Sequence, residues 1–139
     1  MQYDRYMGLD YGNSRIGIAF SDLSGTIATA DSIYKCRGTE EDITFLVNLA
    51  KNKEVRHIVI GLPLNADGTE SEMSKRVRDF GQKLFDRSQI EVFYQDERYT
   101  SFEAEEYLKE ARIPWEKRKT LLDKVAAQII LQNYLDERK

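Results

Sequence analysis

The 139-residue sequence contains a single cysteine, Cys36, and a single histidine, His57. One cysteine can form neither an intrachain disulfide nor a cysteine-based metal site, and one histidine argues against a Ser–His or Cys–His nucleophilic triad. The strongest apolar run, residues 58–64, contains Gly61 and Pro63 and is far shorter than the roughly 20 residues of a membrane-spanning helix. No apolar signal-peptide region follows the N-terminus. These absences predict a cytoplasmic protein with no membrane partner.

The composition is otherwise that of an ordinary globular protein, with 41% hydrophobic and 32% charged residues. Because the length is close to that of a common domain, we expect residues 1–139 to form a single domain around one core. The formal net charge is −3. An acidic balance argues at first against a nucleic-acid partner, because phosphate groups attract a surplus of lysine and arginine.

The first third of the chain has the two-residue period of β-strands. Residues 6–10 and 16–20 form short apolar runs separated by a turn-rich stretch, and a third run covers residues 26–34. Three strands with short connections predict an antiparallel meander. After Gly38 the period lengthens to about 3.6, which predicts a helix that begins near Thr39 and buries a face made of Ile43, Leu46, Val47 and Ala50.

The rest of the chain alternates between strands and helices. Residues 55–60 and 90–94 are the fourth and fifth strands. Thr69-x-x-Glu72 and Thr100-x-x-Glu103 resemble capping boxes, each opening a helix. Pro114 is expected in the first turn of the last helix, which runs to about Glu137. The order βββαβαβα predicts an α/β fold whose five-stranded mixed sheet has three antiparallel strands, then two strands parallel to the first, with helices on both faces.

Three carboxylates fall at positions that this topology brings to one edge of the sheet. Asp10 ends the first strand, Glu97 or its neighbour Asp96 ends the fifth, and Asp123 lies on the last helix before two alanines that permit close packing. The choice between Asp96 and Glu97 stays open, because adjacent strand residues point to opposite faces. Taken singly, each acid has a structural explanation in a turn, a helix N-terminus or a solvated helix face.

Clustered carboxylates repel one another unless a cation lies between them. Their oxygens are hard ligands, suited to Mg²⁺ or Mn²⁺. Acid clusters with one or two such ions support in-line displacement at phosphorus, which requires neither histidine nor cysteine. If Asp10, Glu97 and Asp123 bind metal, the remaining formal charge is neutral, and the net acidity no longer excludes nucleic acid.

Four stretches of the sequence resemble the YqgF/RuvX family. They are GLDYGNSRIGIAFSD at residues 8–22, VIGLPLN followed by DGTE within residues 59–70, DERYTS at residues 96–101, and DKVAAQIIL at residues 123–131. The resemblance implies an RNase H-like fold of the Holliday-junction-resolvase kind and a nuclease that matures the 5′ end of pre-16S ribosomal RNA. By position it implies that Asp10, Glu97 and Asp123 are the catalytic, metal-binding acids.

Basic residues near these acids are candidates for contacts with phosphate. Arg15 lies in the turn after Asp10, and Arg98 follows Glu97, although Arg98 has the alternative of pairing internally with its acidic neighbours. Further candidates occur on two helices and include Arg76 and Lys124. Solvated helix faces explain many such charges equally well.

We therefore expect a metal-dependent nuclease acting on ribosomal precursor RNA, with branched DNA as the alternative substrate. Two other functions compete. An Asp before a glycine turn and a hairpin also opens actin-like kinases and ATPases, but those proteins need two such domains. A non-catalytic adaptor that binds nucleic acid would use its acids structurally. The sequence leaves open a monomer or a homodimer, since symmetrical cleavage of a junction requires two active sites.

Overall fold

The computed structural model describes residues 4–138. No helix in that range is both long and apolar enough to span a membrane. Within it the order of elements is βββαβαβαα. The helix expected from Thr100 and the last helix expected near Pro114 are both present, and the predicted order βββαβαβα counted them as one. The elements are β1 (Tyr6–Tyr11), β2 (Arg15–Ser21), β3 (Ala28–Lys35), α1 (Thr39–Asn52), β4 (His57–Leu62), α2 (Glu72–Ser88), β5 (Glu91–Asp96), α3 (Thr100–Glu110) and α4 (Trp115–Glu137).

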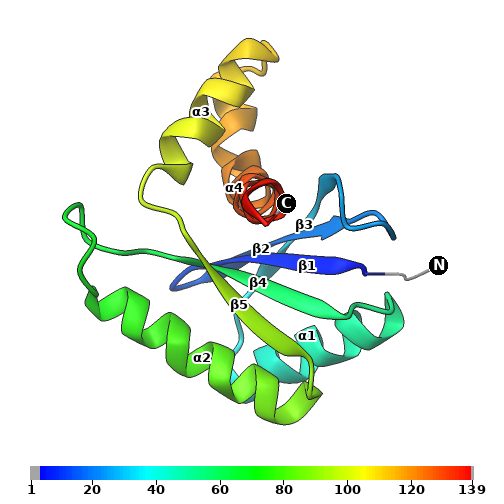
Figure 1. The fold of residues 1–139 in the computed structure, drawn as a ribbon. Helices are drawn as coiled ribbons and strands as arrows, with labels where there is room; N and C mark the ends of the chain where they lie inside the picture. The colour runs from blue at the N-terminus through cyan, green and yellow to red at the C-terminus, as the bar shows by residue number, and fades with distance from the viewer. Residues whose placement is uncertain (1–3, 139) are drawn as a thin grey trace.

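The five strands form one mixed sheet in the order β3-β2-β1-β4-β5. β1 pairs antiparallel with β2, and β2 pairs antiparallel with β3, while β4 lies parallel to β1 and β5 parallel to β4. The predicted topology is therefore confirmed. Figure 1 shows α1 and α2 covering one face of this sheet and α4 lying across the other.

The alternation of side chains along β1 assigns each residue to one of these two faces. Met7 and Leu9 are fully buried in the cluster that includes α1 and α2. Tyr6 belongs to the second cluster, which includes α4. Since Asp10 has the same parity as Tyr6, its carboxyl group faces α4. His57 at the start of β4 stacks on Tyr6 with ring centroids 4.5 Å apart, so it packs against the α4 side of the sheet and lies away from the strand ends that carry the acids.

Small residues on the α4 face of the sheet let the helix approach the strands closely. An ideal Cβ placed on Gly17 of β2 would overlap the carbonyl oxygen of Asp123. A Cβ on Gly8 of β1 would lie 2.7 Å from the Cβ of Leu131. The helix is thus in backbone contact with β2 at Asp123, which fixes the height of that residue above the sheet.

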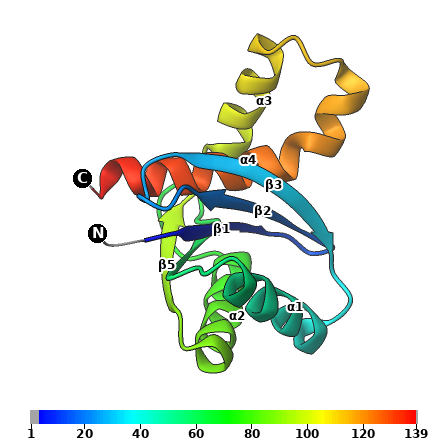
Figure 2. The same ribbon diagram turned by 90° about the vertical axis from the view of Figure 1, so that its right-hand side faces the viewer.

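α3 and the first turns of α4 project away from the sheet as a helical hairpin (Figure 2). Their contact is a separate small cluster built on Ala104, Leu108 and Val125. The opposite side of the hairpin exposes large aromatic side chains, among them Phe102 at 68% and Trp115 at 60%. The hairpin therefore depends on its own packing rather than on the main core.

Both predicted capping boxes are wrong. The cap of α2 is Ser71, whose side chain accepts from the backbone N–H of Ser74 while the Ser74 hydroxyl accepts from the backbone N–H of Ser71. Thr69 cannot cap the helix because its hydroxyl donates to Asp67 at 2.6 Å within the preceding loop. Thr100 is the buried first residue of α3, after Tyr99, which makes no side-chain cap.

Pro114 is the N-cap of α4 rather than part of its first turn. All five strands end one or two residues later than predicted; β1 ends at Tyr11 and β5 at Asp96. Asp10 therefore lies inside β1, in a position set by the regular hydrogen bonding of the sheet.

The close contact at Gly17 leads to a stability prediction. Gly17→Ala should lower the free energy of unfolding by roughly 1–3 kcal/mol, because the added methyl group forces α4 away from β2. Urea denaturation measures the change. Thr29→Ala on the exposed edge strand β3 is the control and should cost less than about 1 kcal/mol. Equal stability of Gly17→Ala and the parent protein would contradict the described contact.

Candidate active site

Asp10 and Glu97 lie together where β1 and β5 end. Asp10 reaches this position from β1, and Glu97 from the residue that follows β5. The backbone N–H of Glu97 donates to the carbonyl of Leu62 at 3.2 Å, which continues the strand pairing beyond β5. A Cβ on Gly61 would lie 2.7 Å from the Glu97 carboxylate. Because Gly61 has no side chain, the Glu97 side chain can lie above it and extend across β4 toward Asp10.

The two carboxyl groups share a hydrogen bond in a largely buried setting. Burial, followed by the charge of Asp123, raises the pKa of Asp10 to about 6. Burial and the proximity of Asp10 raise the pKa of Glu97 to about 9. Near neutral pH the pair therefore retains a proton between its oxygens, because two like charges at this distance are costly without a cation.

Asp96 belongs to a different interaction. Its carboxylate lies 2.8 Å from an Arg98 guanidinium nitrogen and accepts the backbone N–H of Arg98 at 3.0 Å. Partial burial opposes the effect, but these bonds and the charge of Arg98 hold the pKa of Asp96 below its ordinary value. Of the two adjacent acids, Glu97 is the one beside Asp10.

Asp123 approaches the pair from α4 but forms an ion pair with Arg15. The Arg15 Nε atom lies 3.1 Å from Asp123 Oδ2. Across residues 4–138, no group of three or more His, Cys, Asp and Glu side chains is arranged closely enough to hold a metal ion. The structure thus brings Asp10 and Glu97 together, while the third predicted acid, Asp123, is paired with Arg15 beside them.

The chemistry of the donors still suits a divalent cation. Carboxylate oxygens are the ligands that Mg²⁺ and Mn²⁺ prefer, and the shared proton marks a place where positive charge is required. Asp10 and Glu97 fit as the centre of such a site. Asp123 can join them when its side chain leaves Arg15, since that ion pair is partly exposed to solvent.

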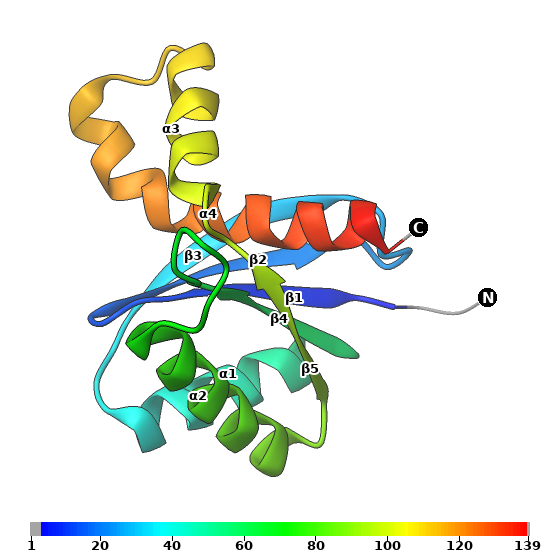
Figure 3. The ribbon, with the colours of Figure 1, turned by 60° about the vertical axis from the view of Figure 1, so that its left-hand side comes forward.

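The four predicted basic residues differ in their surroundings. Arg15 is paired with Asp123, and Arg98 with Asp96. Arg98 also donates to the carbonyl of Ala66 at 3.2 Å, so it joins the loop between β4 and α2 to the segment after β5 (Figure 3). Lys124 follows Asp123 on α4 and is partly buried. Arg76 lies on α2, on the other side of the sheet.

Two residues that the sequence pattern did not single out position Arg76. Its Nη1 donates to the side-chain oxygen of Asn13 at 2.8 Å, and its positive charge acts on the hydroxyl of Tyr11, where it opposes the rise in pKa that burial causes. Strand parity contains a signal for Tyr11, because the residue after Asp10 in β1 must point to the opposite face. The contact with Asn13 spans 63 positions along the chain and leaves no local pattern.

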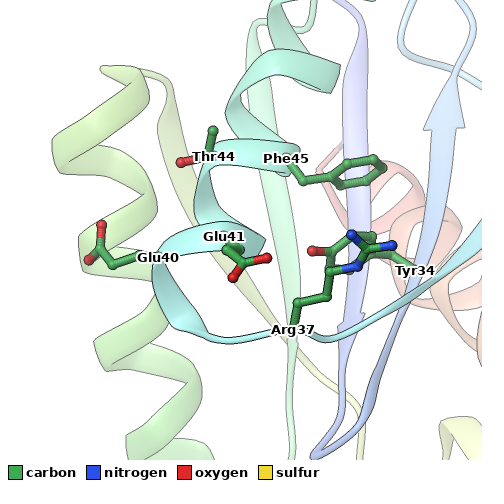
Figure 4. A pocket seen from close by; sticks show the side chains of 6 residues that line it. All are labelled: Tyr34, Arg37, Glu40, Glu41, Thr44 and Phe45. Carbon is green, nitrogen blue, oxygen red and sulfur yellow. The ribbon is translucent and has the colours of Figure 1, made fainter.

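A cavity of about 570 Å³ lies elsewhere, between the end of β3 and the start of α1 (Figure 4). It is lined by Tyr34, Arg37, Glu40, Glu41, Thr44 and Phe45. Tyr34 stacks on Phe45 with centroids 4.2 Å apart, and Glu40 is paired with Arg87 at 3.1 Å. Because its lining includes none of the three acids, we assign the candidate site to Asp10 and Glu97.

The acid pair leads to a prediction on pH. The folded protein holds the Asp10 and Glu97 protons more tightly than the unfolded chain does. Their contribution to stability is therefore lost as pH rises from about 4 to about 9. At pH 8 with chelator present, the free energy of unfolding of Asp10→Asn should be higher than that of the parent protein by roughly 1–3 kcal/mol.

Urea denaturation at pH 4.5 and pH 8 tests this, and the advantage should shrink at the lower pH. Asp96→Asn is the matched control with the opposite sign, since the lowered pKa of Asp96 stabilises the fold above about pH 4. A parent protein that is more stable than Asp10→Asn at pH 8 would show that no such repulsion exists.

Comparison with known proteins supports the fold and identifies the family. Two solved structures share the RNase H-like architecture. A Thermus thermophilus RuvC in complex with a Holliday junction substrate has a TM-score of 0.62 and 10% identity, covering 98% of this chain and 96% of that chain. The Fowlpox virus resolvase in complex with Holliday junction DNA has a TM-score of 0.60 and 12% identity, covering 96% of this chain and 98% of its own.

Relatives of higher identity carry the name "Putative pre-16S rRNA nuclease". The Syntrophomonas wolfei protein is 44% identical over 95% of this chain and 94% of its own length. The Endomicrobium trichonymphae protein is 46% identical over 96% of each chain. The sequence model of the RuvX family, described as Holliday junction resolvase, matches residues 4–137. The chain belongs to the RuvX family.

Proposed function

We propose that the protein is a divalent-metal-dependent nuclease that hydrolyses phosphodiester bonds in RNA, with maturation of the 5′ end of pre-16S ribosomal RNA as its task. The observation that carries the proposal is the buried Asp10–Glu97 pair at the edge of the sheet, with Asp123 at its side. The names of the relatives and of the family support a nuclease. In this proposal residues 1–139 act as a single nuclease domain in the cytoplasm.

Asp10, Glu97 and Asp123 are the proposed ligands and catalytic acids. A bound Mg²⁺ or Mn²⁺ supplies an activated water and stabilises the charge that develops on the phosphate. Asp10 and Glu97 would hold the cation as carboxylates, so their shared proton would be released when it bound. The Gly61 gap keeps Glu97 directed at Asp10, so the pair is oriented before substrate arrives.

Arg15 has a second role in this proposal. While it is paired with Asp123, it neutralises an acid that lies close to Asp10. If Asp123 were to bind a cation with Asp10 and Glu97, the Arg15 guanidinium would be available to a substrate phosphate, to which it could donate two parallel hydrogen bonds. Lys124, the next residue along α4, adds positive charge on the same side.

Cleavage assays with labelled single-stranded RNA, single-stranded DNA and four-way junctions test the proposal, each with Mg²⁺, Mn²⁺ or chelator. We expect metal-dependent cleavage of RNA, and Asp10→Asn, Glu97→Gln and Asp123→Asn should each lower its rate at least about 100-fold. Asp96→Asn is the matched control and should retain activity, because Asp96 pairs with Arg98 rather than Asp10.

The other outcomes separate the alternatives. An active Asp123→Asn variant would refute the three-acid assignment. Binding without cleavage under every condition would indicate the adaptor. Preferred cleavage of four-way junctions, together with the molar mass of a homodimer in solution, would favour the resolvase, a substrate consistent with the family's description.

A further inference from the structure

A second cavity, of about 350 Å³, lies on the opposite side of the sheet edge from the acids. It is bounded by the end of β1, the start of α1 and the first half of α2. The lining residues are Tyr11, Thr39, Lys75, Arg76, Asp79, Phe80 and Lys83. The cavity is therefore small and rich in cationic side chains.

The charge of this cavity is only partly compensated. Asp79, its one carboxylate, pairs with Lys83 at 3.2 Å. The nearby Glu70 is bound by Arg78 through two hydrogen bonds, at 2.9 and 3.1 Å. Among the ion pairs of the described residues, none includes Lys75 or Arg76. Two positive charges thus remain for an anion.

Arg76 is held in place for such a ligand. Asn13 accepts one of its N–H groups at 2.8 Å, and the Tyr11 side chain lines the same cavity beside it. Tyr11 is itself fixed by packing on Phe80, with ring centroids 4.4 Å apart. A guanidinium has five N–H donors, so donors remain for phosphate oxygens after these contacts.

The position of Tyr11 relates this cavity to the acids. Asp10 and Tyr11 are neighbours in β1 and point to opposite faces of the sheet. A nucleic-acid strand that crosses the end of β1 would therefore place one phosphate beside Asp10 and another beside Arg76. α3 offers no comparable route, because it carries Glu103, Glu105, Glu106 and Glu110 against one lysine.

We propose that Lys75 and Arg76, oriented by Tyr11 and Asn13, form a subsite for an internal phosphodiester of the substrate strand, on the side of the sheet edge away from the cleavage site. The inference rests on the proposed nuclease function and adds how the strand is held. The subsite binds phosphate by charge and by hydrogen bonds, so it is insensitive to base sequence.

Salt-dependent binding tests the subsite. Fluorescence anisotropy of a labelled single-stranded RNA is measured from 0.05 to 0.3 M salt in an Asp10→Asn background, which prevents cleavage. Lys75→Gln/Arg76→Gln should weaken binding and reduce the slope of log affinity against log salt by about 0.7, because the variant no longer neutralises the one phosphate charge of the subsite. Lys51→Gln, at the far end of α1, is the control and should leave the slope unchanged.

A second arm identifies the phosphate. RNAs of equal length that end in a 5′-hydroxyl or a 5′-phosphate should lose the same affinity in the double variant. A loss confined to the 5′-phosphorylated RNA would overturn the assignment to an internal phosphodiester. An unchanged slope in the double variant would overturn the subsite altogether.

The orienting role of Tyr11 has its own test. Tyr11→Phe keeps the packing on Phe80 and removes the hydroxyl from the cavity that Arg76 also lines. Affinity should fall roughly 2- to 10-fold with the salt slope unchanged, because no charge is removed. Unchanged affinity would show that Tyr11 does not position Arg76.

Failure of the subsite and failure of the nuclease are distinguishable. If the parent protein cleaves no substrate but the double variant still flattens the salt slope, the subsite stands and the nuclease does not. If cleavage depends on Asp10 while the double variant binds like the parent protein, the nuclease stands and the subsite falls.

Discussion

The close approach of α4 to the sheet is the contact on which the rest of the molecule depends. It is possible only because Gly8 and Gly17 present no side chains where the helix crosses β1 and β2. The same absence of side chains at Gly61 gives Glu97 its path to Asp10. A sheet face with larger residues would raise α4 by a layer of side chains, and Asp123 would then lie beyond reach of the acid pair. The glycines thus act through the space they leave rather than through contacts of their own.

Much of this fold follows from the period of the sequence. The alternation in β1 and β2 and the helical stripes of α1 and α2 arise from burial of one face, which is encoded locally by neighbouring residues. Helix ends were harder to predict. Thr69 has the spacing of a capping residue, yet its hydroxyl bonds to Asp67 in the loop, and the cap passes to Ser71. Capping depends on which hydrogen-bond partner lies closest to a short side chain, and the four-residue pattern of a capping box does not contain that information.

The candidate site also combines residues that the sequence places with residues that it does not. Asp10 and the acidic end of β5 could be placed from topology, because parallel strands end at the same edge. The choice of Glu97 over Asp96 required the face of β5, and the sequence at that strand end is polar on both parities. The ion pair of Asp123 with Arg15 and the contact of Arg76 with Asn13 join distant segments. Such contacts depend on how helices are placed over the sheet, which periodicity alone does not determine.

The sheet edge also explains how an acidic protein can receive a phosphate strand. Because adjacent residues of β1 point to opposite faces, Asp10 belongs to the acid pair and Tyr11 to the cationic cavity. A strand crossing this edge would meet Lys75 and Arg76 on one side of the sheet and the acid pair on the other. At the acids it meets a pair whose mutual repulsion is relieved by a proton or a divalent cation. Local separation of charge, rather than the net charge of −3, therefore decides where phosphate can bind.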